Sequence, residues 1–384
     1  MSSGVVLKKP VLPGQTVGIL GGGQLGRMFA IAARRMGYRV HSFDPTNDCP
    51  AGQVADVEVN AAYDDVEAAL HFANHVDVVT FEFENIPAET LEAVAKFRPV
   101  YPDPNVLHTC RHRLREKQFL QANGFPLADF RPVENVNQLH QAVIELGSPA
   151  VLKTADFGYD GKGQQRIHSP DDVADAWANL GRPVGVLERF VPFEKEISVV
   201  CARSLAGEIV CFPPAENEHR NHILDVTTVP SQLSQDQQTQ AVELARDITN
   251  NLNVVGVLAV EMFVLPDCNI LVNELAPRPH NSGHFSFDAS LTSQFEQQLR
   301  AVCGLPLGDV TLLRPVAMAN LLGELWQNGE PNWKAALEIP QVKLHLYGKR
   351  EPRPGRKMGH LTALAESANE ARASVLAARD RLTF

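Results

Sequence analysis

The sequence is poor in cysteine, and its six cysteines follow no recognisable pattern. They are scattered over 384 residues, and no two of them stand in a Cys-x-x-Cys spacing. A disulfide framework or a structural zinc site would need paired, closely spaced cysteines. Isolated thiols of this kind are typical of a reducing compartment, so we expect a cytoplasmic protein.

Positive charge and long apolar runs are also missing. The chain carries 35 Lys and Arg against 45 Asp and Glu, a formal net charge of −10. Proteins that bind nucleic acid or membrane surfaces usually present a positive field, and a membrane-spanning helix needs about 18 or more consecutive apolar residues. The composition therefore predicts no nucleic-acid partner and no membrane partner, and any anionic ligand must be held by a local group of donors.

What is present is an ordinary globular composition, 44% apolar and 21% charged, in a chain long enough for two or three domains. Its first hundred residues alternate short apolar strands with amphipathic helices. We expect strands at 16–20, 39–43, 76–81 and 100–101, and helices at 25–36, 64–74 and 87–96. This order predicts a small βαβ sheet, a Rossmann-like domain over residues 1–108.

Further along, the pattern changes to alternating β segments with fewer helices. We expect helices at 111–123, 170–180, 234–251 and 366–382, and strands at 184–190, 195–203, 207–213, 254–265, 270–276, 314–321 and 341–347. A middle domain is assigned to residues 109–310, with a lid-like subdomain at about 145–190. A small β-rich C-terminal domain is assigned to residues 311–384, so the fold class is α/β combined with α+β.

The first candidate site is the segment "GILGGGQLGRM" at residues 18–28. Gly21, Gly23 and Gly26 fit the G-x-G-x-x-G fingerprint between a strand and a helix, and Asp44 follows where a ribose-binding acid would lie. Three interpretations stay open: a tight turn without ligand, an NAD site, or a phosphate held by backbone N–H groups at a helix N-terminus. The βαβ block is too short for the two mononucleotide-binding halves of an NAD domain, which favours a phosphorylated substrate.

A second glycine-rich segment is "KTADFGYDGKGQ", residues 153–164. In a hairpin turn, its flexible N–H groups and its lysine could close over a polyphosphate; the alternative is a mobile β-turn. Lys153 stands in an apolar strand, so its ammonium must face something anionic. The following "VLERFV", residues 186–191, fits either an adenine-binding linker or an ordinary strand with solvated charges.

The most informative segment is "AVEMFVLPDCNILVNELAPRPHNSGH", residues 259–284. A hairpin centred between Asp267 and Cys268 would place Glu261 opposite Glu274, about 5 Å apart. Two carboxylates at that distance repel and have raised pKa values unless a cation lies between them. The pair therefore predicts a Mg²⁺ site, with Asn273 as a further oxygen ligand; the alternative is a register slip that turns one glutamate to solvent.

Two polar segments complete the set of candidate sites. Arg278, His280, Asn281 and His284 follow the hairpin in a run too dense for a passive loop. Near the C-terminus, "HLYGKREPRPGRKMGHLT" places Lys349 and Arg356 on either side of a Pro-Gly turn. This turn is either a solvated basic loop or a clamp on a phosphate, which Arg356 could bind in a bidentate manner.

Together these segments resemble the ATP-grasp superfamily, and within it the family of 5-(carboxyamino)imidazole ribonucleotide synthases. The residues that carry the resemblance are "GILGGGQLGRM", "TFEFENIP", "FGYDGKGQ", "NELAPRPHNSGH" and "YGKREPRPGRKMGH", which span residues 18–360. The resemblance implies an ATP-grasp domain in the middle of the chain, preceded by the Rossmann-like (pre-ATP-grasp) domain. It also implies a ligase of purine biosynthesis that carboxylates 5-aminoimidazole ribonucleotide with ATP and bicarbonate through carboxyphosphate, needs Mg²⁺ and forms a homodimer.

The resemblance also assigns residues. It implies a nucleotide site made of Arg113, Lys153, Gly158, Tyr159, Asp160, Gly161, Lys162, Gly163, Gln164, Glu188, Arg189, Phe190, Val191, Glu196, His219, Asn273 and Glu274. The chemistry at bicarbonate and the amine falls to Arg278, His280, Lys162, Asp160, Tyr159 and Glu82. The ribonucleotide would be bound by Gly23, Gln24, Leu25, Glu82, Asn281, Lys349 and Arg356, and Mg²⁺ by Glu261 and Glu274. Arg111 and Arg113 both lie where one ATP-contacting arginine is expected, and we assign Arg113, which precedes Lys117 as in the family pattern.

Other functions remain open at this level. A second enzymatic interpretation is a different ATP-grasp ligase, such as a formate-using glycinamide ribonucleotide transformylase or a biotin carboxylase. An NAD-dependent dehydrogenase and a catalytically silent nucleotide sensor are alternatives from other classes. The short C-terminal domain and the Lys349–Arg356 pair favour the imidazole ribonucleotide as substrate.

Overall fold

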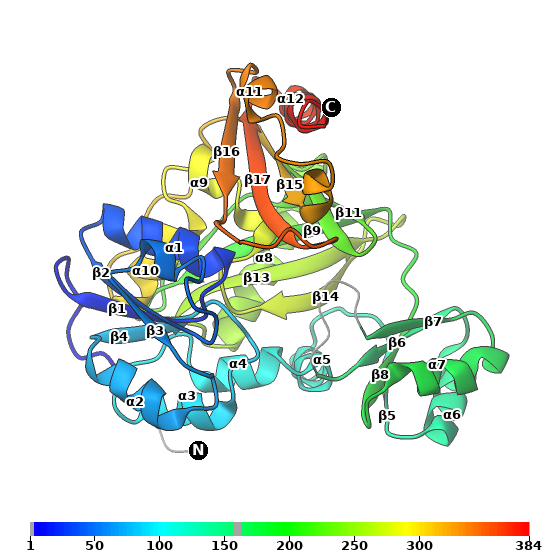
Figure 1. Cartoon of the computed structure of the whole chain (residues 1–384). Helices are drawn as coiled ribbons and strands as arrows, with labels where there is room; N and C mark the ends of the chain where they lie inside the picture. The colour runs from blue at the N-terminus through cyan, green and yellow to red at the C-terminus, as the bar shows by residue number, and fades with distance from the viewer. Residues whose placement is uncertain (1–3, 157–162, 384) are drawn as a thin grey trace.

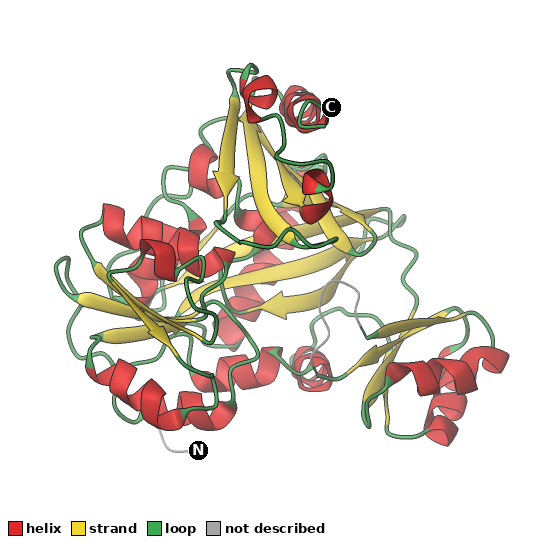
Figure 2. Cartoon of the chain, viewed as in Figure 1, coloured by secondary structure: helices red, strands yellow, loops and turns green. Residues whose placement is uncertain are grey.

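The computed structural model describes residues 4–156 and 163–383. These residues form three sheets with helices packed around them (Figure 1). The N-terminal sheet, a large central sheet and a small separate sheet are distinct in Figure 2. No helix in the described ranges is both long and apolar enough to cross a membrane.

The N-terminal domain is a four-stranded parallel sheet in the order β3–β2–β1–β4. Its elements are β1 (Thr16–Leu20), α1 (Gln24–Arg35), β2 (Arg39–Asp44), η1 (Gly52–Val54), β3 (Val57–Asn60), α2 (Val66–Asn74), β4 (Val78–Phe81) and α3 (Ala88–Ala95). Helix α1 covers one face of this sheet and α2 and α3 cover the other (Figure 1). The predicted βαβ sheet is therefore confirmed.

A small subdomain follows. Helices α4 (Pro104–Cys110) and α5 (Arg113–Ala122) lead to a second sheet in the order β5–β8–β6–β7. Its elements are β5 (Phe130–Val133), α6 (Val136–Leu146), β6 (Ala150–Thr154), β7 (Gln164–Ile167), η2 (Pro170–Asp172), α7 (Val173–Leu180) and β8 (Gly185–Arg189). Strands β6 and β7 are an antiparallel pair, which confirms the predicted hairpin on either side of the glycine-rich loop.

The large sheet has the strand order β14–β13–β9–β11–β12–β15–β17–β16, with β10 on β9. Its strands are β9 (Lys195–Arg203), β10 (Ile209–Cys211), β11 (Ala215–Arg220), β12 (Ile223–Val229), β13 (Gly256–Val264), β14 (Ile270–Ala276), β15 (Val316–Leu322), β16 (Val342–Leu346) and β17 (Lys357–Leu364). The other elements are α8 (Gln235–Asn251), η3 (Asn281–Gly283), α9 (Ser286–Ala289), α10 (Gln294–Val302), η4 (Gly323–Trp326), α11 (Trp333–Leu337) and α12 (Ala368–Asp380). Because β12 pairs with β15, the expected boundary near residue 310 lies within one continuous sheet.

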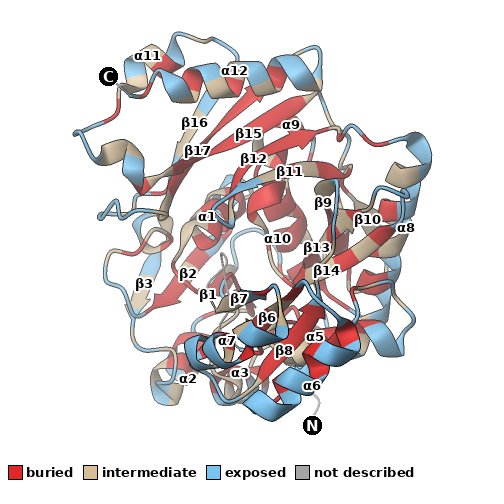
Figure 3. Cartoon of the chain, turned by 90° about the vertical axis from the view of Figure 1, so that its right-hand side faces the viewer, coloured by how far each residue is buried: buried red, intermediate tan, exposed pale blue. Residues whose placement is uncertain are grey.

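Strand β9 shows how this sheet positions a site. Ile197, Val199 and Cys201 point to α8, whereas Val200 and Ala202 point to the opposite core. Alternation along a strand places Glu196 and Ser198 on the same face as Val200. This face of β9 is therefore apolar toward its C-terminal end and polar toward its N-terminal end. The residues at the N-terminal end of β9 are half-buried (Figure 3).

Several expected elements differ from the structure. The helix expected at 111–123 is α5, which begins two residues later at Arg113, because His112 is its N-cap and accepts from the Arg115 N–H. Residues 100–101 make only an isolated bridge, between Val100 and Val79. Ten helices and strands were not expected from the sequence: β3, α4, β5, α6, β11, β12, α9, α10, α11 and β17.

Candidate active site

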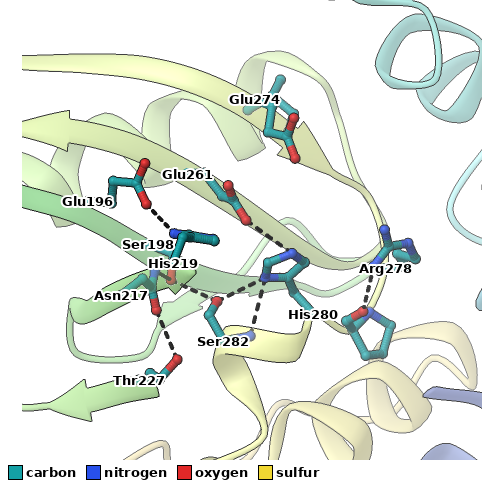
Figure 4. A network of polar contacts seen from close by, with 12 residues as sticks. Glu196, Ser198, Asn217, His219, Thr227, Glu261, Glu274, Arg278, His280 and Ser282 are labelled. Carbon is teal, nitrogen blue, oxygen red and sulfur yellow. Dashed lines mark hydrogen bonds and ion pairs between the residues drawn. The ribbon is translucent and has the colours of Figure 1, made fainter. Parts of the chain in front are cut away.

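The site is organised around Glu261 and Glu274, which are direct cross-strand partners on β13 and β14 (Figure 4). This confirms the predicted pairing, although the turn lies elsewhere than expected. The N–H of Leu265 donates to the carbonyl of Asn269 at 2.9 Å, so the turn is centred on Asp267.

A β-bulge restores the pairing between Glu261 and Glu274. The register shifts between Glu261 and Met262, because Met262 faces Val272 whereas Glu261 faces Glu274. Asn273 is thus the extra residue of β14. Bulges redirect side chains and are frequent beside active sites, and this one brings the two carboxylates together.

The two carboxylates differ in exposure, since 16% of the Glu261 side chain and 42% of the Glu274 side chain are exposed. Burial, followed by the charge of Glu274, raises the pKa of Glu261 to about 8. The same two causes raise the pKa of the buried Glu116 to about 8, and Glu116 Oε2 accepts from the Leu275 N–H at 2.8 Å. The site therefore has excess negative charge that a cation would relieve.

Another buried carboxylate of the site, that of Glu188, is contacted by two lysine ammonium groups. Glu188 on β8 is 4% exposed, and its Oε2 lies 3.0 Å from Lys153 Nζ and 3.1 Å from Lys117 Nζ. Despite its burial, the two lysines together with Arg113 lower the pKa of Glu188 to about 2. The anionic partner expected for Lys153 is thus Glu188, and two ammonium groups converge on one carboxylate.

Lys117 was not among the expected site residues. It is completely buried, and it lies on α5 one turn after Arg113. A lysine in the otherwise polar segment "RLREKQFL" carries no signal of burial, so only its place four residues after Arg113 could have indicated it.

The structure separates the two candidate arginines. Arg113 Nη1 lies 3.6 Å from Glu274 Oε2, and its backbone N–H donates to the Ala155 carbonyl at 2.9 Å. Arg111 instead donates to the carbonyl of Ile86 in the N-terminal domain at 3.0 Å. Arg113 is therefore the arginine that faces the carboxylate pair.

The remaining residues expected at the nucleotide lie along β7, β8, β9 and β11. His219 and Glu196 form an ion pair (Figure 4), which raises the pKa of the histidine. Gly163 has a φ of 73° and lies against Thr154, and Gln164 begins β7. Arg189 is exposed and pairs with Asp129 at 3.2 Å, while Phe190 packs under Arg166 and Val191 is half-buried. Five further expected residues lie outside the described part of the chain: Gly158, Tyr159, Asp160, Gly161 and Lys162.

Arg278 and His280 connect the carboxylate pair to the N-terminal domain. His280 Nε2 lies 3.1 Å from Glu261 Oε1, and Arg278 Nη2 lies 2.8 Å from Glu84 Oε1. Burial, with the nearby charge of Arg278, holds the pKa of His280 well below its usual range. The neighbouring Asn281 is 6% exposed, and within the described residues neither polar atom of its side chain has a hydrogen-bond partner.

The glycine turn differs from the expected phosphate cradle. The Gly23 N–H donates to Glu82 Oε1 at 2.6 Å and the Gly22 N–H donates to Asp44 Oδ2 at 2.7 Å, so two of its amides already serve carboxylates. Helix α1 begins at Gln24, and the N–H groups of its first turn have no acceptor within the helix. A phosphate would therefore meet the amides of Gln24 and Leu25 rather than that of Gly23.

Asp44 also decides against an NAD site. Besides the Gly22 amide, its carboxylate accepts from Thr46 N at 2.8 Å and from the Tyr63 hydroxyl at 2.6 Å. It is 8% exposed. An acid committed in this way is not available for ribose hydroxyls.

Lys349 brings the C-terminal segment to the same place. Its Nζ donates to Gln24 Oε1 at 2.6 Å and to the Lys357 carbonyl at 2.7 Å. Arg356 is half-buried at the end of the same loop, and its Nη1 donates to the Glu351 carbonyl at 2.8 Å. The lysine thus lies at the N-terminus of α1, although 325 residues separate it from Gln24.

The donor set fits a hard divalent cation completed by a ligand. In residues 4–156 and 163–383, no cluster of three or more His, Cys, Asp or Glu side chains could hold a metal ion alone. Glu261 and Glu274 supply carboxylate oxygens, and Asn273 Oδ1 is buried without a hydrogen-bond partner among the described residues. Mg²⁺ usually takes one or two carboxylates and the oxygens of substrate phosphates, so this set suits Mg²⁺ bound with a nucleotide.

The domain order and this site define an ATP-grasp ligase. Residues 118–295 match the ATP-grasp domain, residues 14–111 the ribonucleotide synthetase preATP-grasp domain, and residues 316–374 the phosphoribosylaminoimidazole carboxylase C-terminal domain. The chain is 46% identical to the N5-carboxyaminoimidazole ribonucleotide synthase of Bacillus subtilis over 363 residues, which cover 94% of this chain and 95% of the relative. The chain belongs to the family of N5-carboxyaminoimidazole ribonucleotide synthases.

Solved structures agree with this assignment. An N5-carboxyaminoimidazole ribonucleotide synthetase in complex with ADP has a TM-score of 0.93 and 44% identity, covering 98% of this chain and all of that one. The Aspergillus clavatus enzyme in complex with ADP and 5-aminoimidazole ribonucleotide has a TM-score of 0.88 and 32% identity, covering 96% and 98% of the two chains. The predicted fold class and family are therefore confirmed.

Proposed function

We propose that this chain carboxylates 5-aminoimidazole ribonucleotide with ATP and bicarbonate, releasing ADP and phosphate, in purine biosynthesis. The observation that carries the proposal is a set of three contacts, made by residues close in sequence, that links the two binding regions. His280 contacts Glu261, and Arg278, two residues before it in the chain, contacts Glu84. Glu82, two residues before Glu84, accepts from the glycine turn. A nucleotide at the carboxylate pair and a ribonucleotide at the turn would therefore meet at Arg278 and His280.

We assign the nucleotide to the residues that lie between the small sheet and the large sheet. Lys117, Lys153 and Arg113 supply positive charge for the phosphates, and Glu196 lies where ribose hydroxyls are expected. Mg²⁺, when bound by Glu261, Glu274 and Asn273, would neutralise charge on the phosphates. The chain's own task is to orient the terminal phosphate for attack by bicarbonate oxygen and to stabilise the charge that develops.

The second step joins the carboxyl group of carboxyphosphate to the amine. This intermediate is unstable in water, so the site must exclude solvent while the amine attacks. We assign Arg278 to the carboxyl oxygens, because its guanidinium is permanently charged and can bind a planar anion by two hydrogen bonds. Glu82, Asn281, the amides of Gln24 and Leu25, Lys349 and Arg356 would hold the ribonucleotide; Tyr159, Asp160 and Lys162 of the glycine-rich loop are assigned to the same pocket from the family resemblance.

We further propose that the enzyme is cytoplasmic and dimeric. All six cysteines are free thiols, as is typical of a reducing compartment. The dimer rests on the family resemblance alone, and light scattering of the purified protein tests it.

A coupled assay of ADP release tests the reaction. ADP should appear only when ATP, Mg²⁺, bicarbonate and 5-aminoimidazole ribonucleotide are all present, and carbon from labelled bicarbonate should enter the product. Glycinamide ribonucleotide with formate is the control for a different ATP-grasp ligase. ADP release that is independent of the imidazole ribonucleotide, or that follows the control substrates, would contradict the proposal.

A further inference from the structure

A chain of buried hydrogen bonds reaches His280 from the middle of the large sheet (Figure 4). The Thr227 hydroxyl donates to Asn217 Oδ1 at 2.9 Å, and Asn217 Nδ2 donates to Ser198 Oγ at 3.0 Å. The Ser198 hydroxyl donates to Ser282 Oγ at 2.7 Å, and Ser282 Oγ lies 2.9 Å from His280 Nδ1. The chain thus ends on the ring nitrogen opposite the one that faces Glu261.

These residues form a row across the sheet. Thr227 on β12 and Asn217 on β11 are direct cross-strand partners, and Ser198 on β9 is the partner of Glu261 on β13. Ser282 lies in η3, the short helix whose N-cap is His280. The carboxylate pair therefore continues sideways into a polar row, which ends at Thr227.

All four supporting side chains are buried. The exposed fractions are 0% for Thr227, 6% for Asn217, 1% for Ser198 and 0% for Ser282. Burying hydroxyl and amide groups is unfavourable unless they are hydrogen-bonded. A buried polar network whose members are satisfied holds one geometry rigidly, which is more than simple filling of the core requires.

The hydrogen bonds from Thr227 to His280 all have the same donor-to-acceptor direction beyond Asn217. Asn217 Nδ2 can only donate, and the Ser198 hydroxyl donates in turn to Ser282 Oγ. Each hydroxyl has one hydrogen, so Ser282 keeps its own for His280 Nδ1. The backbone N–H of Ser282, at 3.4 Å, also points to this nitrogen. Both neighbours of Nδ1 are therefore donors, and a neutral imidazole that accepts at Nδ1 carries its proton on Nε2.

We propose that Ser282, Ser198, Asn217 and Thr227 are positioning residues that hold His280 as the Nε2–H tautomer. The Nε2–H group is then aimed at Glu261 Oε1, 3.1 Å away, and at whatever anion lies beside it. In this form His280 is a hydrogen-bond donor toward the reacting carboxyl group, and it does not accept the proton of the amine at Nε2. The inference rests on the proposed function only in naming that anion.

Substituting Asn217 by Asp tests the direction of the chain. The side chain keeps its shape, but a carboxylate only accepts, so the Ser198 hydroxyl would turn toward it and away from Ser282. We expect the histidine ¹⁵N spectrum of the whole protein to lose the Nε2–H signature of His280, assigned with His280→Gln. We also expect kcat with the imidazole ribonucleotide to fall on the order of 10²-fold, while KM for ATP stays within about two-fold.

A second variant covers the case in which the new carboxylate impairs folding. Ser198→Ala breaks the chain without adding charge, and should reduce kcat about 10-fold, again with ATP KM unchanged. Asn320→Asp and Thr362→Val are matched controls, because both residues are buried in neighbouring strands of the same sheet, β15 and β17, and do not belong to the chain of hydrogen bonds. The controls should retain the wild-type His280 spectrum and kcat.

The spectrum is recorded without substrates, so it decides the inference independently of the proposed function. A wild-type His280 protonated at Nδ1 would overturn the inference. So would Asn217→Asp and Ser198→Ala variants that keep the wild-type spectrum and kcat. Absence of any turnover with the imidazole ribonucleotide in the wild type would instead overturn the proposed function. The spectrum would still show which nitrogen of His280 carries the proton.

Discussion

Glu261 and Glu274 are the residues whose substitution should show most clearly what the site binds. We expect Glu261→Gln or Glu274→Gln to raise the Mg²⁺ concentration needed for activity and to reduce turnover by about 10²-fold or more, because a charge-stabilising group is lost. The measurement is ADP release against Mg²⁺ concentration. Glu216→Gln on the same sheet, where Glu216 pairs with Lys195 at 2.9 Å, is the control, and near-normal kinetics at limiting Mg²⁺ in both site variants would refute the assignment.

Glu82 should make the stability of the protein depend on pH. Burial raises the pKa of Glu82 to about 7, whereas an unfolded glutamate has a pKa of about 4.3. Between these values the folded protein holds a proton that the unfolded chain releases, so the contribution of Glu82 to stability falls as pH rises toward 7 and is fully present only below about pH 4. Glu82→Gln has no such proton, and its Oε1 can still accept from Gly23.

Urea unfolding of the wild type and Glu82→Gln at several pH values between about 5 and 8 measures this difference. The free energy of unfolding of the variant should improve relative to the wild type as pH rises. A difference that does not change with pH would show that Glu82 titrates normally in the folded protein.

Residue types and spacing predicted the carboxylate pair, Lys153 and Arg278, because each is a charged group at a position that must be buried or paired. They could not predict Lys117 or the row from Ser198 to Thr227. Serine, threonine and asparagine are ordinary in strands that face solvent, and only the packing of β9, β11 and β12 shows that these are buried.

At the scale of elements, the β6–β7 hairpin depends on a glycine at its end. Gly163 has a φ of 73°, and a Cβ there would lie 2.7 Å from Thr154 Oγ1; its carbonyl accepts from the Thr154 N–H at 2.9 Å. We expect Gly163→Val to distort the hairpin that carries Lys153 and to raise KM for ATP about 10-fold. Steady-state kinetics with ATP varied is the measurement.

Gly181 provides the matched control for this substitution. It has a φ of 64° in the same subdomain, but a Cβ there would meet no atom within 4 Å. Gly181→Val should therefore show the cost of backbone strain without the change in ATP KM. Equal effects of the two substitutions would mean that the hairpin end has no special part in binding ATP.

The bulge in β14 shows what sequence periodicity can and cannot predict for an element. The predicted hairpin is regular and centred between Asp267 and Cys268, whereas the observed turn is centred on Asp267 and is followed by a bulge at Asn273. Both arrangements pair Glu261 with Glu274. Alternation of apolar residues predicted both strands, but it contains no information on where a ladder gains a residue. Strand β11 could not be predicted from periodicity either, because "AENEHR" carries almost no apolar alternation.

At the scale of the molecule, Lys349 joins the first and last segments of the chain at one site. We expect Lys349→Ala and Arg356→Ala to raise KM for 5-aminoimidazole ribonucleotide about 10-fold or more and to leave KM for ATP nearly unchanged, since phosphate contacts are lost only at the ribonucleotide. Arg350→Ala is the control, because Arg350 also bridges the two domains, through Asp48 at 2.6 Å, but is exposed. A loss of ATP affinity, or an equal effect of Arg350→Ala, would contradict the clamp.

The pairing of β12 with β15 has a consequence for solubility. If translation stopped or a protease cut near residue 310, residues 226–229 of β12 would lose their neighbours on β15. Strand β12, which is now inside the sheet, would then become an exposed edge strand. Open apolar edges recruit strands from other molecules. A shortened chain that retains every residue assigned to ATP would therefore precipitate rather than survive as an ATP-binding fragment. The residues after 310 protect the protein from aggregation as well as contributing to its site.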